Sequence, residues 1–452
     1  MKKPIFIIAG THSGCGKTTI TLGLMSALVS RGYKVQGYKV GPDFIDPGHH
    51  KEITKRVSHN LDTWMLDEQE NIRILFSYVK EADVGIIEGV MGLFDGYSGT
   101  SEKGSTAHLA KIAQIPVILV IDAKSMARSV APLVYGFLNY DKNLNIKGVI
   151  FNQIGSKRHF SILKDALKDL NVKIYGALPK EKSIYIPSRH LGLITHQDFS
   201  KKDNWNFLLS KLIEENINVD EILEDCCVVI KDFSEENNRK ITGKKVKIGV
   251  AMDNAFCFYY GENLNYLKKF GAELCFFSPL KDKSLPEGIK GIYLGGGYPE
   301  LHCYELSSNR EMLKSIHEFS VSGGVVYAEC GGFMYLTSGI KDLENKFWPM
   351  VGVFPFKCVM DKKFRALGYR EVILDKDCIL GVRSMKIRGH EFHYSSIIGA
   401  QEEVEKIYTV KNLDGTKEGF YIHKTLGSYI HLHFGSNPKA AYSLVENCEH
   451  LQ

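Results

Sequence analysis

The sequence predicts an α/β protein made of two domains, the first of them built on a parallel β-sheet. Two observations lead to this fold class. Short apolar runs rich in β-branched residues alternate with longer segments of helical character, and one polar stretch divides that alternation into two series. With 44% of its 452 residues hydrophobic and 24% charged, the chain also has the composition of a globular protein with sizeable cores.

The first series contains six predicted strands separated by helical patterns. This order of elements builds a parallel sheet whose faces are covered by helices. The strands are Pro4–Ala9, Val35–Val40, Val84–Glu88, Pro116–Asp122, Lys147–Asn152 and Val172–Gly176. We assign residues 1–200 to this first domain.

A second α/β domain is predicted at residues 246–440. The chain before it is polar, so we expect a linker at residues 201–245. The predicted strands of the second domain are Lys247–Ala251, Glu273–Phe277, Gly291–Leu294 and Gly324–Ala328, with helices at Asn263–Phe270 and Arg310–Ser320.

Charge and composition exclude several classes of protein. The 57 Lys and Arg against 52 Asp and Glu leave a net charge of +5, too little for the basic surface of a nucleic-acid-binding protein. The apolar run Ile5–Ala9 is too short for a signal peptide or a membrane span. Ten scattered cysteines without a CxxC pair argue against a disulfide framework or a zinc site. We expect a cytoplasmic protein without nucleic-acid or membrane partners, and a homodimer is compatible with the sequence.

A glycine-rich segment, GTHSGCGKTT at residues 10–19, follows the first strand and opens a helix. In such a loop the backbone amides face phosphate oxygens, the lysine reaches the terminal phosphates and the threonine binds Mg²⁺. The spacing is a variant, because glycine stands at residue 10 and not at residue 11. Asn152, at the end of the fifth strand, is a candidate for reading the nucleotide base. The predicted ATP site therefore consists of Ser13, Gly14, Gly16, Lys17, Thr18, Thr19 and Asn152.

Acidic residues follow the next two strands. Asp43 and Asp46 come after the second strand, and Glu88 ends the third. Ligands of α/β sheets collect at this edge, and a carboxylate there holds Mg²⁺ directly or through water. We therefore predict a metal site formed by Thr18, Asp46 and Glu88. The alternative for each acid is a role as a turn or capping residue.

Cys330 lies on a predicted strand–turn–helix elbow, GGVVYAECGGFMYL. Such a turn exposes a nucleophile, and the start of the following helix stabilises a thiolate. Farther along, His431 and His433 share one face of an extended segment. His431 is the predicted base and His433 the residue that orients it. The alternative is a buried structural cysteine with histidines in the core.

A second glycine run, at residues 295–297, ends another predicted strand. Its bare amides suit an oxyanion hole, which we assign to Gly296, Gly297 and Gly331. A turn without a catalytic role is the alternative. The stretch Arg388–Ser395 is also rich in polar side chains, but the sequence assigns it no role.

The cysteine elbow, the distant His-x-His and the upstream glycine loop together resemble a class I glutamine amidotransferase domain. Ordinary members carry a glutamate where this chain has His433, and the departure resembles the cobalamin-pathway subgroup. The N-terminal half resembles the dethiobiotin-synthetase-like P-loop group, whose phosphate loops also begin G-T and carry G-K-T. With VGPDFIDPGHH, IIEGVMGLFDG and GSYIHLHF, nearly the whole chain resembles the cobyrinic acid a,c-diamide synthase family.

The resemblance implies an amidoligase that uses ATP and L-glutamine as co-substrates and Mg²⁺ as cofactor. ATP would phosphorylate a carboxylate of a tetrapyrrole polycarboxylate substrate, and Cys330 would release ammonia from glutamine to form the amide. Two side chains of the substrate, a and c, would be amidated. The resemblance further implies that Asp43, Asp46 and Glu88 activate the substrate.

Three alternatives stay open. The Ni-sirohydrochlorin a,c-diamide synthases of coenzyme F430 assembly resemble the chain in both domains, and no residue separates the two activities. Cobyric acid synthases rank behind them, because their members are longer and usually carry His-Gly in place of His-x-His. The alternative from another class is a P-loop switch ATPase whose C-terminal domain is a non-catalytic binding module.

Overall fold

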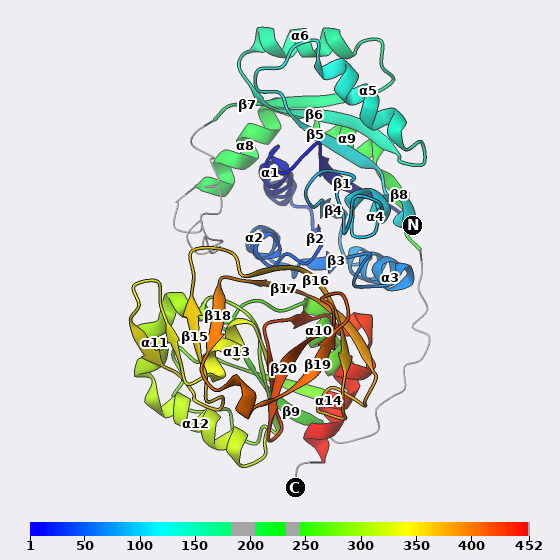
Figure 1. The fold of residues 1–452 in the computed structure, drawn as a ribbon. Coiled ribbons are helices and arrows are strands. Elements are labelled where there is room, and N and C mark those ends of the chain that lie inside the picture. The colour runs from blue at the N-terminus through cyan, green and yellow to red at the C-terminus, as the bar shows by residue number, and fades with distance from the viewer. Residues whose placement is uncertain (182–203, 232–244, 451–452) are drawn as a thin grey trace. The chain divides into compact units, whose positions relative to one another are not determined.

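The computed structural model describes residues 1–181, 204–231 and 245–450 (Figure 1). The chain divides into two compact units, residues 1–237 and residues 238–452. Within the described residues, no helix is both long enough and apolar enough to cross a membrane.

A parallel sheet forms the centre of the first unit, with strand order β3-β2-β4-β1-β5-β6-β7. All six predicted strands are present, and the short strand β3 and the antiparallel strand β8 at the start of β1 are additions. The strands are β1 Lys2–Gly10, β2 Val35–Val40, β3 His59–Leu61, β4 Val84–Glu88, β5 Val117–Asp122, β6 Ile146–Ile154, β7 Lys173–Pro179 and β8 Cys227–Val229.

Helices cover this sheet, and side chains at their first turns explain several starts. The Asp67 carboxylate accepts the Glu70 N–H at 2.7 Å, and the Ser105 hydroxyl accepts the His108 N–H at 3.0 Å. The helices are α1 Lys17–Ser30, α2 Ile45–Thr54, α3 Glu68–Val79, α4 Thr106–Ala113, α5 Val130–Tyr140, α6 Lys157–Leu167, α8 Trp205–Asn216 and α9 Val219–Asp225.

Helices α8 and α9 lie in the stretch that its polar composition assigned to a linker. Leu209 and Ile213 of α8 are buried against α1, where Gly23 lets the two helices approach closely. A Cβ atom on Gly23 would lie 2.5 Å from the Ile213 side chain. Helix α1 is therefore covered by the sheet and by α8, which explains why it is apolar on almost every side. Residues 201–203 and 232–244 of the expected linker lie outside the described residues.

The second unit contains a ten-stranded sheet with order β10-β9-β11-β12-β21-β20-β19-β16-β17-β22. Its first five strands are parallel, and the others run antiparallel to their neighbours. The predicted strands are confirmed as β9 Val246–Ala251, β10 Ala272–Phe277, β11 Gly291–Leu294 and β12 Val325–Glu329. The antiparallel part consists of β16 Ala366–Leu374, β17 Lys386–His393, β19 Glu405–Val410, β20 Thr416–Ile422, β21 Thr425–Ser428 and β22 His431–Leu432, where β21 joins the two parts.

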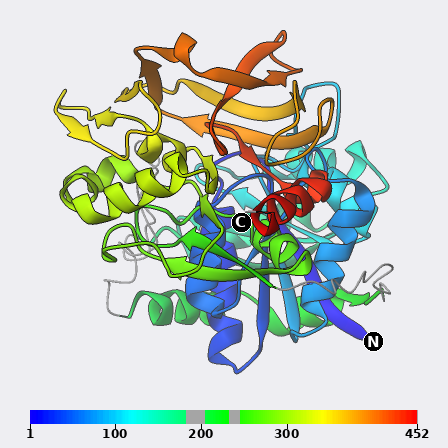
Figure 2. The same cartoon turned by 90° about the horizontal axis from the view of Figure 1, so that it is seen from below.

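Helices and a small second sheet complete this unit. Helix α10 packs against α14, drawn in red in Figure 2. The helical elements are α10 Gly261–Lys269, η1 Pro299–His302, α11 Cys303–Ser308, α12 Arg310–Val321, α13 Gly331–Leu336, η2 Gln401–Glu403, η3 Phe434–Ser436 and α14 Lys439–Glu449. The small sheet contains β13 Gly339–Lys341, β14 Phe347–Pro349, β15 Lys357–Met360 and β18 Ser395–Ile398.

The turn between β12 and α13 depends on close backbone contacts. The Gly332 N–H donates to the Gly295 carbonyl at 3.0 Å, and a Cβ atom on Gly332 would lie 2.3 Å from the Leu294 carbonyl oxygen. Behind the turn, Phe333 is buried in an aromatic cluster with Phe354, Phe420 and Tyr429. The short helix is thus held against β11 by backbone atoms that have no freedom to move aside.

We expect Gly332→Ala to lower the stability of the second unit by about 1–3 kcal/mol, because the added methyl group overlaps backbone. Gly136→Ala is a matched control in α5, where a Cβ atom would meet nothing within 4 Å. The control should raise stability by about 0.5–1 kcal/mol, since Gly is a poor helix former. Scanning calorimetry of both variants measures the effect, and an unchanged transition for Gly332→Ala would contradict this account of the turn.

Candidate active sites

The predicted ATP-binding residues of the glycine-rich segment lie in the loop after β1 and in the first turn of α1. Two left-handed glycines shape the loop, Gly14 with φ 83° and Gly16 with φ 105°. The Asn152 side chain donates to the Cys15 carbonyl at 3.0 Å, and a Cβ atom on Gly16 would lie 2.0 Å from the Asn152 amide nitrogen. Asn152 therefore holds the loop from behind, and its predicted contact with a nucleotide base stays a prediction.

Lys17 points across the loop toward the segment that follows β4. Its ammonium group donates to the Met91 carbonyl at 2.5 Å, and the Leu93 N–H donates to the Gly10 carbonyl at 2.8 Å. Burial lowers the pKa of Lys17, although the charge of Glu88 acts to raise it. The segment after β4, which carries the motif IIEGVMGLFDG, is thus hydrogen-bonded to the phosphate loop. The two lie side by side because β1 and β4 are adjacent parallel strands.

Glu88 is at the centre of a buried polar network beside Thr18. Its Oε1 atom accepts hydrogen bonds from the Thr18 hydroxyl at 2.6 Å and from the Lys39 ammonium group at 3.1 Å. Its Oε2 atom lies 2.8 Å from Nε2 of His50. Lys39 also contacts Asp46 at 2.6 Å, so one buried ammonium group joins the two predicted metal-binding carboxylates.

The charges in this network stabilise one another. Burial disfavours the charged form of Lys39, but Asp46 and Glu88 offset it and raise its pKa. Burial and the charge of Asp46 act to raise the pKa of Glu88, yet Lys39 and His50 hold it below its usual range. The Lys39 ammonium group therefore favours the ionised form of Glu88 and contacts both carboxylates.

Asp43 binds backbone N–H groups at the start of α2, whereas Asp46 contacts Lys39. The Oδ1 atom of Asp43 accepts the N–H groups of Ile45 at 2.7 Å and of Asp46 at 3.3 Å, at the first turn of α2. Asp43 precedes the N-cap Phe44, and these bonds agree with the role as a turn or capping residue that the sequence left open as the alternative. These bonds fix the start of α2, and they thereby position the Asp46 side chain for its contact with Lys39.

The oxygen atoms of Thr18, Asp46 and Glu88 fit a magnesium ion. They are hard ligands, and the bridging position of Lys39 shows that a cation between the carboxylates is favourable. In the described ranges, no group of three or more His, Cys, Asp or Glu side chains is arranged to hold a metal. One hydroxyl and two carboxylates are a donor set compatible with Mg²⁺, which keeps several waters and takes further ligands from phosphate.

In the second unit, Cys330 stands alone between β12 and α13 with a strained backbone, φ 47° and ψ −105°. Two hydrogen bonds hold this conformation, from its N–H to the Ser428 carbonyl at 2.7 Å and from the Met334 N–H to its own carbonyl at 2.9 Å. Burial raises the pKa of the Cys330 thiol, and the Gly331 amide only partly opposes this effect. The thiol therefore needs a base to become a nucleophile.

The Gly295–Gly297 loop brings His431 and the cysteine turn to the same place. A Cβ atom on Gly296 would lie 2.3 Å from Cε1 of His431, and one on Gly331 would lie 3.0 Å from the Gly297 nitrogen. Burial lowers the pKa of His431 to about 3, so its imidazole is neutral at physiological pH and can accept a proton.

The three glycines predicted for the oxyanion hole differ in whether their backbone N–H group already has a hydrogen-bond acceptor among the described residues. The Gly296 N–H donates to the Phe258 carbonyl at 3.2 Å, so this amide belongs to a backbone pair. Its missing side chain makes room for the His431 ring. Gly297 and Gly331 lie against each other beside Cys330, and these two amides are the stronger candidates for the oxyanion hole.

His433 is linked to His431 indirectly, through the rings of Tyr260 and His390. Its Nδ1 atom accepts the Gly435 N–H at 3.1 Å, and its ring centroid lies 4.5 Å from that of Tyr260. The Tyr260 hydroxyl shares a 2.6 Å hydrogen bond with His390, and the His390 ring stacks on His431 with centroids 4.9 Å apart. The orienting role of His433 stays a prediction.

Comparisons with known proteins agree with this two-part arrangement. The family model of the CobQ/CobB/MinD/ParA nucleotide binding domain matches residues 6–194, and that of the CobB/CobQ-like glutamine amidotransferase domain matches residues 247–439. A Caldanaerobacter subterraneus protein named cobyrinate a,c-diamide synthase is 44% identical over 98% of this chain and 98% of its own length. Proteins of the same name from Dehalococcoides mccartyi and Archaeoglobus fulgidus are each 41% identical, over 98% and 99% of this chain and 98% of their own.

The chain belongs to the cobyrinate a,c-diamide synthase family. It is a glutamine-dependent amidating ligase with a nucleotide-binding domain, which confirms the resemblance and the α/β fold class seen in the sequence. Membership also argues against the switch ATPase with a non-catalytic C-terminal module, because that module is a glutamine amidotransferase domain.

Sequence reasoning missed several charged residues beside the two sites. Strand β17, which overlaps the unassigned stretch Arg388–Ser395, passes next to Cys330, whose sulfur lies 3.8 Å from the Phe392 carbonyl. On that strand, Glu391 binds Arg370 at 2.6 Å and His393 at 2.8 Å. The clustering of polar residues in this stretch was the available signal, but no spacing rule links a strand so distant to Cys330.

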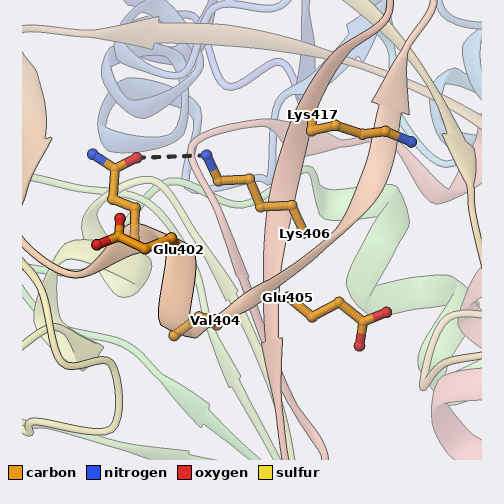
Figure 3. Close-up of a pocket in the computed structure, with 6 residues that line it drawn as sticks. Glu402, Val404, Glu405, Lys406 and Lys417 are labelled. Atoms are coloured by element: carbon orange, nitrogen blue, oxygen red, sulfur yellow. Dashed lines mark hydrogen bonds between the residues drawn. The ribbon is translucent and has the colours of Figure 1, made fainter.

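A surface pocket of the second unit lies apart from these residues (Figure 3). It is lined by Gln401, Glu402, Val404, Glu405, Lys406 and Lys417. Lys406 donates to Gln401 at 3.5 Å, Lys417 contacts Asp375 at 2.7 Å, and Glu405 is paired with Lys376. The lining contains none of the residues of the two candidate sites, so this pocket does not mark either of them.

Removing the ammonium group of Lys39 should destabilise the first unit. In Lys39→Met, Asp46 and Glu88 would lose the ammonium group that joins them, at a cost of about 3–5 kcal/mol. The carboxyl pKa values of the folded variant would then lie above their unfolded values, so the deficit should shrink as the pH falls toward about 5.

Thermal unfolding at two pH values tests this expectation. The exposed Lys55, paired with Glu52 at 2.9 Å, supplies the control Lys55→Met, which should cost less than about 0.5 kcal/mol. An equal loss of stability in the two variants would show that the buried network is not organised by the Lys39 charge.

Proposed function

We propose that this protein converts the a and c side-chain carboxylates of cobyrinate to amides, with ATP as the activating reagent and glutamine as the nitrogen source. One observation carries the proposal. A phosphate loop with a buried acid cluster and a strained cysteine with a neutral histidine occur in one chain, whose relatives of 40–44% identity are named cobyrinate a,c-diamide synthase.

The first unit would activate the carboxylate. Loop amides and Lys17 bind the ATP phosphates, and a carboxylate oxygen of the substrate attacks the terminal phosphorus. ADP leaves and an acyl phosphate forms. Thr18, Asp46 and Glu88 would hold Mg²⁺, which neutralises phosphate charge when it is bound.

The second unit would supply ammonia. Neutral His431 takes the proton of Cys330, and the thiolate attacks the carboxamide carbon of glutamine. The oxyanion faces the amides of Gly297 and Gly331. His431 then returns the proton to the departing ammonia, and water hydrolyses the thioester to glutamate.

Ammonia would then displace phosphate from the acyl phosphate and leave the amide. Each round consumes one ATP and one glutamine and changes one carboxylate, so two rounds produce the a,c-diamide. The acyl phosphate is the shared intermediate, which means that free ammonium can replace glutamine in the second half of the reaction.

The purified protein should amidate cobyrinate in the presence of ATP, Mg²⁺ and glutamine, with the mass change of two carboxyl-to-amide conversions. Ni-sirohydrochlorin serves as the parallel substrate, and faster turnover of it would assign the chain to coenzyme F430 assembly. Cys330→Ala should lose the glutamine-driven reaction and keep the ammonium-driven one. Mass spectrometry follows both, and no amidation of either substrate would contradict the proposal.

The acid cluster should be needed only for the activation half. We expect Glu88→Gln to lower ammonium-driven amidation by about 10²-fold or more, because the neutral amide cannot stabilise a cation at the phosphates. Glutamate release by the same variant should continue, and comparing the two rates measures the separation. Equal losses of both activities would mean that Glu88 supports the fold and not the activation step.

A further inference from the structure

Glu329, the residue directly before Cys330, is a buried carboxylate that the proposed mechanism does not use. It ends β12, and its side chain is 1% exposed. The Tyr327 hydroxyl donates to Oε1 at 2.6 Å, the Tyr293 hydroxyl donates to Oε2 at 2.8 Å, and the Leu432 N–H donates to Oε1 at 3.0 Å. Three donors from three strands therefore fix this carboxylate.

The same carboxylate faces the predicted base. Oε2 of Glu329 lies 3.9 Å from Nδ1 of His431, which is 2% exposed. Because Leu432 directly follows His431, its hydrogen bond to Glu329 also fixes the backbone that carries the histidine. One side chain thus connects the strand of the nucleophile to the strand of the base.

We propose that Glu329 is a positioning residue for His431, holding Nδ1 toward its own carboxylate and leaving Nε2 to act on Cys330. This inference rests on the proposed glutaminase reaction. In that reaction the S–H bond of Cys330 breaks and an N–H bond forms at Nε2, while the proton on Nδ1 stays between His431 and Glu329. The positive imidazolium that results lies beside the Glu329 carboxylate, which stabilises it more than it stabilises the neutral ring.

The surroundings of His431 make a positive charge on its ring costly. Burial lowers the pKa of His431 to about 3, and the charge of His393 lowers it further while that of Glu391 raises it. A carboxylate close to Nδ1 would reduce this cost. Burial raises the pKa of Glu329 to about 7, while its three donors oppose that rise. The two groups therefore form no permanent ion pair at neutral pH, and their attraction appears when the proton moves from Cys330.

A second carboxylate in the same unit shows that burial alone does not define this role. Burial also raises the pKa of Glu418 to about 7, and this side chain accepts hydrogen bonds from Ser428, the Gly419 N–H and the Tyr429 N–H. The short distance to Nδ1 of His431 distinguishes Glu329. Glu418→Gln is therefore a matched control for Glu329→Gln.

The experiment compares both variants in the full-length protein. For Glu329→Gln we expect kcat for glutamine hydrolysis to fall by about 10²-fold with KM for glutamine changed by less than about threefold, since the loss belongs to the transition state. Ammonium-driven amidation should stay at the wild-type rate. Glu418→Gln should keep kcat within about threefold of wild type.

Three results would overturn the proposal. One is an unchanged kcat in Glu329→Gln, the second is a rise of KM without a fall of kcat, and the third is an equal fall of kcat in both variants. If Glu329→Gln also loses ammonium-driven amidation, it has not folded, and Tyr293→Phe replaces it. That variant keeps the carboxylate but removes a donor to Oε2, and an unchanged kcat there would refute the role.

The same assays separate this proposal from the proposed function. Wild-type protein that fails to hydrolyse glutamine would contradict the glutaminase reaction itself. Wild-type protein that hydrolyses glutamine but amidates no tetrapyrrole would contradict the substrate, and the comparison of Glu329→Gln with Glu418→Gln would remain valid.

Discussion

A glutamate buried at the carboxyl end of a central parallel strand organises each unit of this protein. Glu88 ends β4 and Glu329 ends β12, and their exposed fractions are 0% and 1%. An unpaired carboxylate would be very costly in such a place, so the neighbouring elements must supply donors. In the first unit these donors are Thr18, Lys39 and His50, and this requirement aligns the phosphate loop with the second strand and α2.

In the cysteine turn, a strained backbone conformation is held by hydrogen bonds and by close packing. Cys330 adopts a backbone conformation that is unfavourable for a residue with a side chain. The Ser428 carbonyl holds its N–H, and the glycines around it allow β11 and α13 to approach within contact distance. Phe333 anchors the other side of the helix in the aromatic core. A rigid frame of this kind keeps the thiol in one place without any help from a bound substrate.

Local patterns carried much of this information. Apolar runs located the parallel strands of both units apart from β3 and β21. The glycine-rich segment with Lys17 and Thr18 predicted a nucleotide site, because the chemistry of a phosphate loop depends on a few adjacent residues. The elbow around Cys330 was recognisable for the same reason. Patterns were less informative for β16, β17, β19 and β20, whose half-exposed surfaces lack a continuous apolar run. They also misjudged α8, whose polar surroundings concealed a buried apolar face.

Residue types and short spacings were therefore sufficient for the fold class and the two kinds of chemistry, and they supplied Cys330 as the candidate nucleophile. Partnerships between distant strands required the folded chain. Lys39 bridges Asp46 and Glu88. The Gly296 N–H donates to the Phe258 carbonyl, and its missing side chain leaves room for the His431 ring. Glu329 faces that histidine. The reason is that a hydrogen bond or an ion pair depends on atoms a few ångströms apart, and residues on different elements of the chain reach that distance only through strand register and packing.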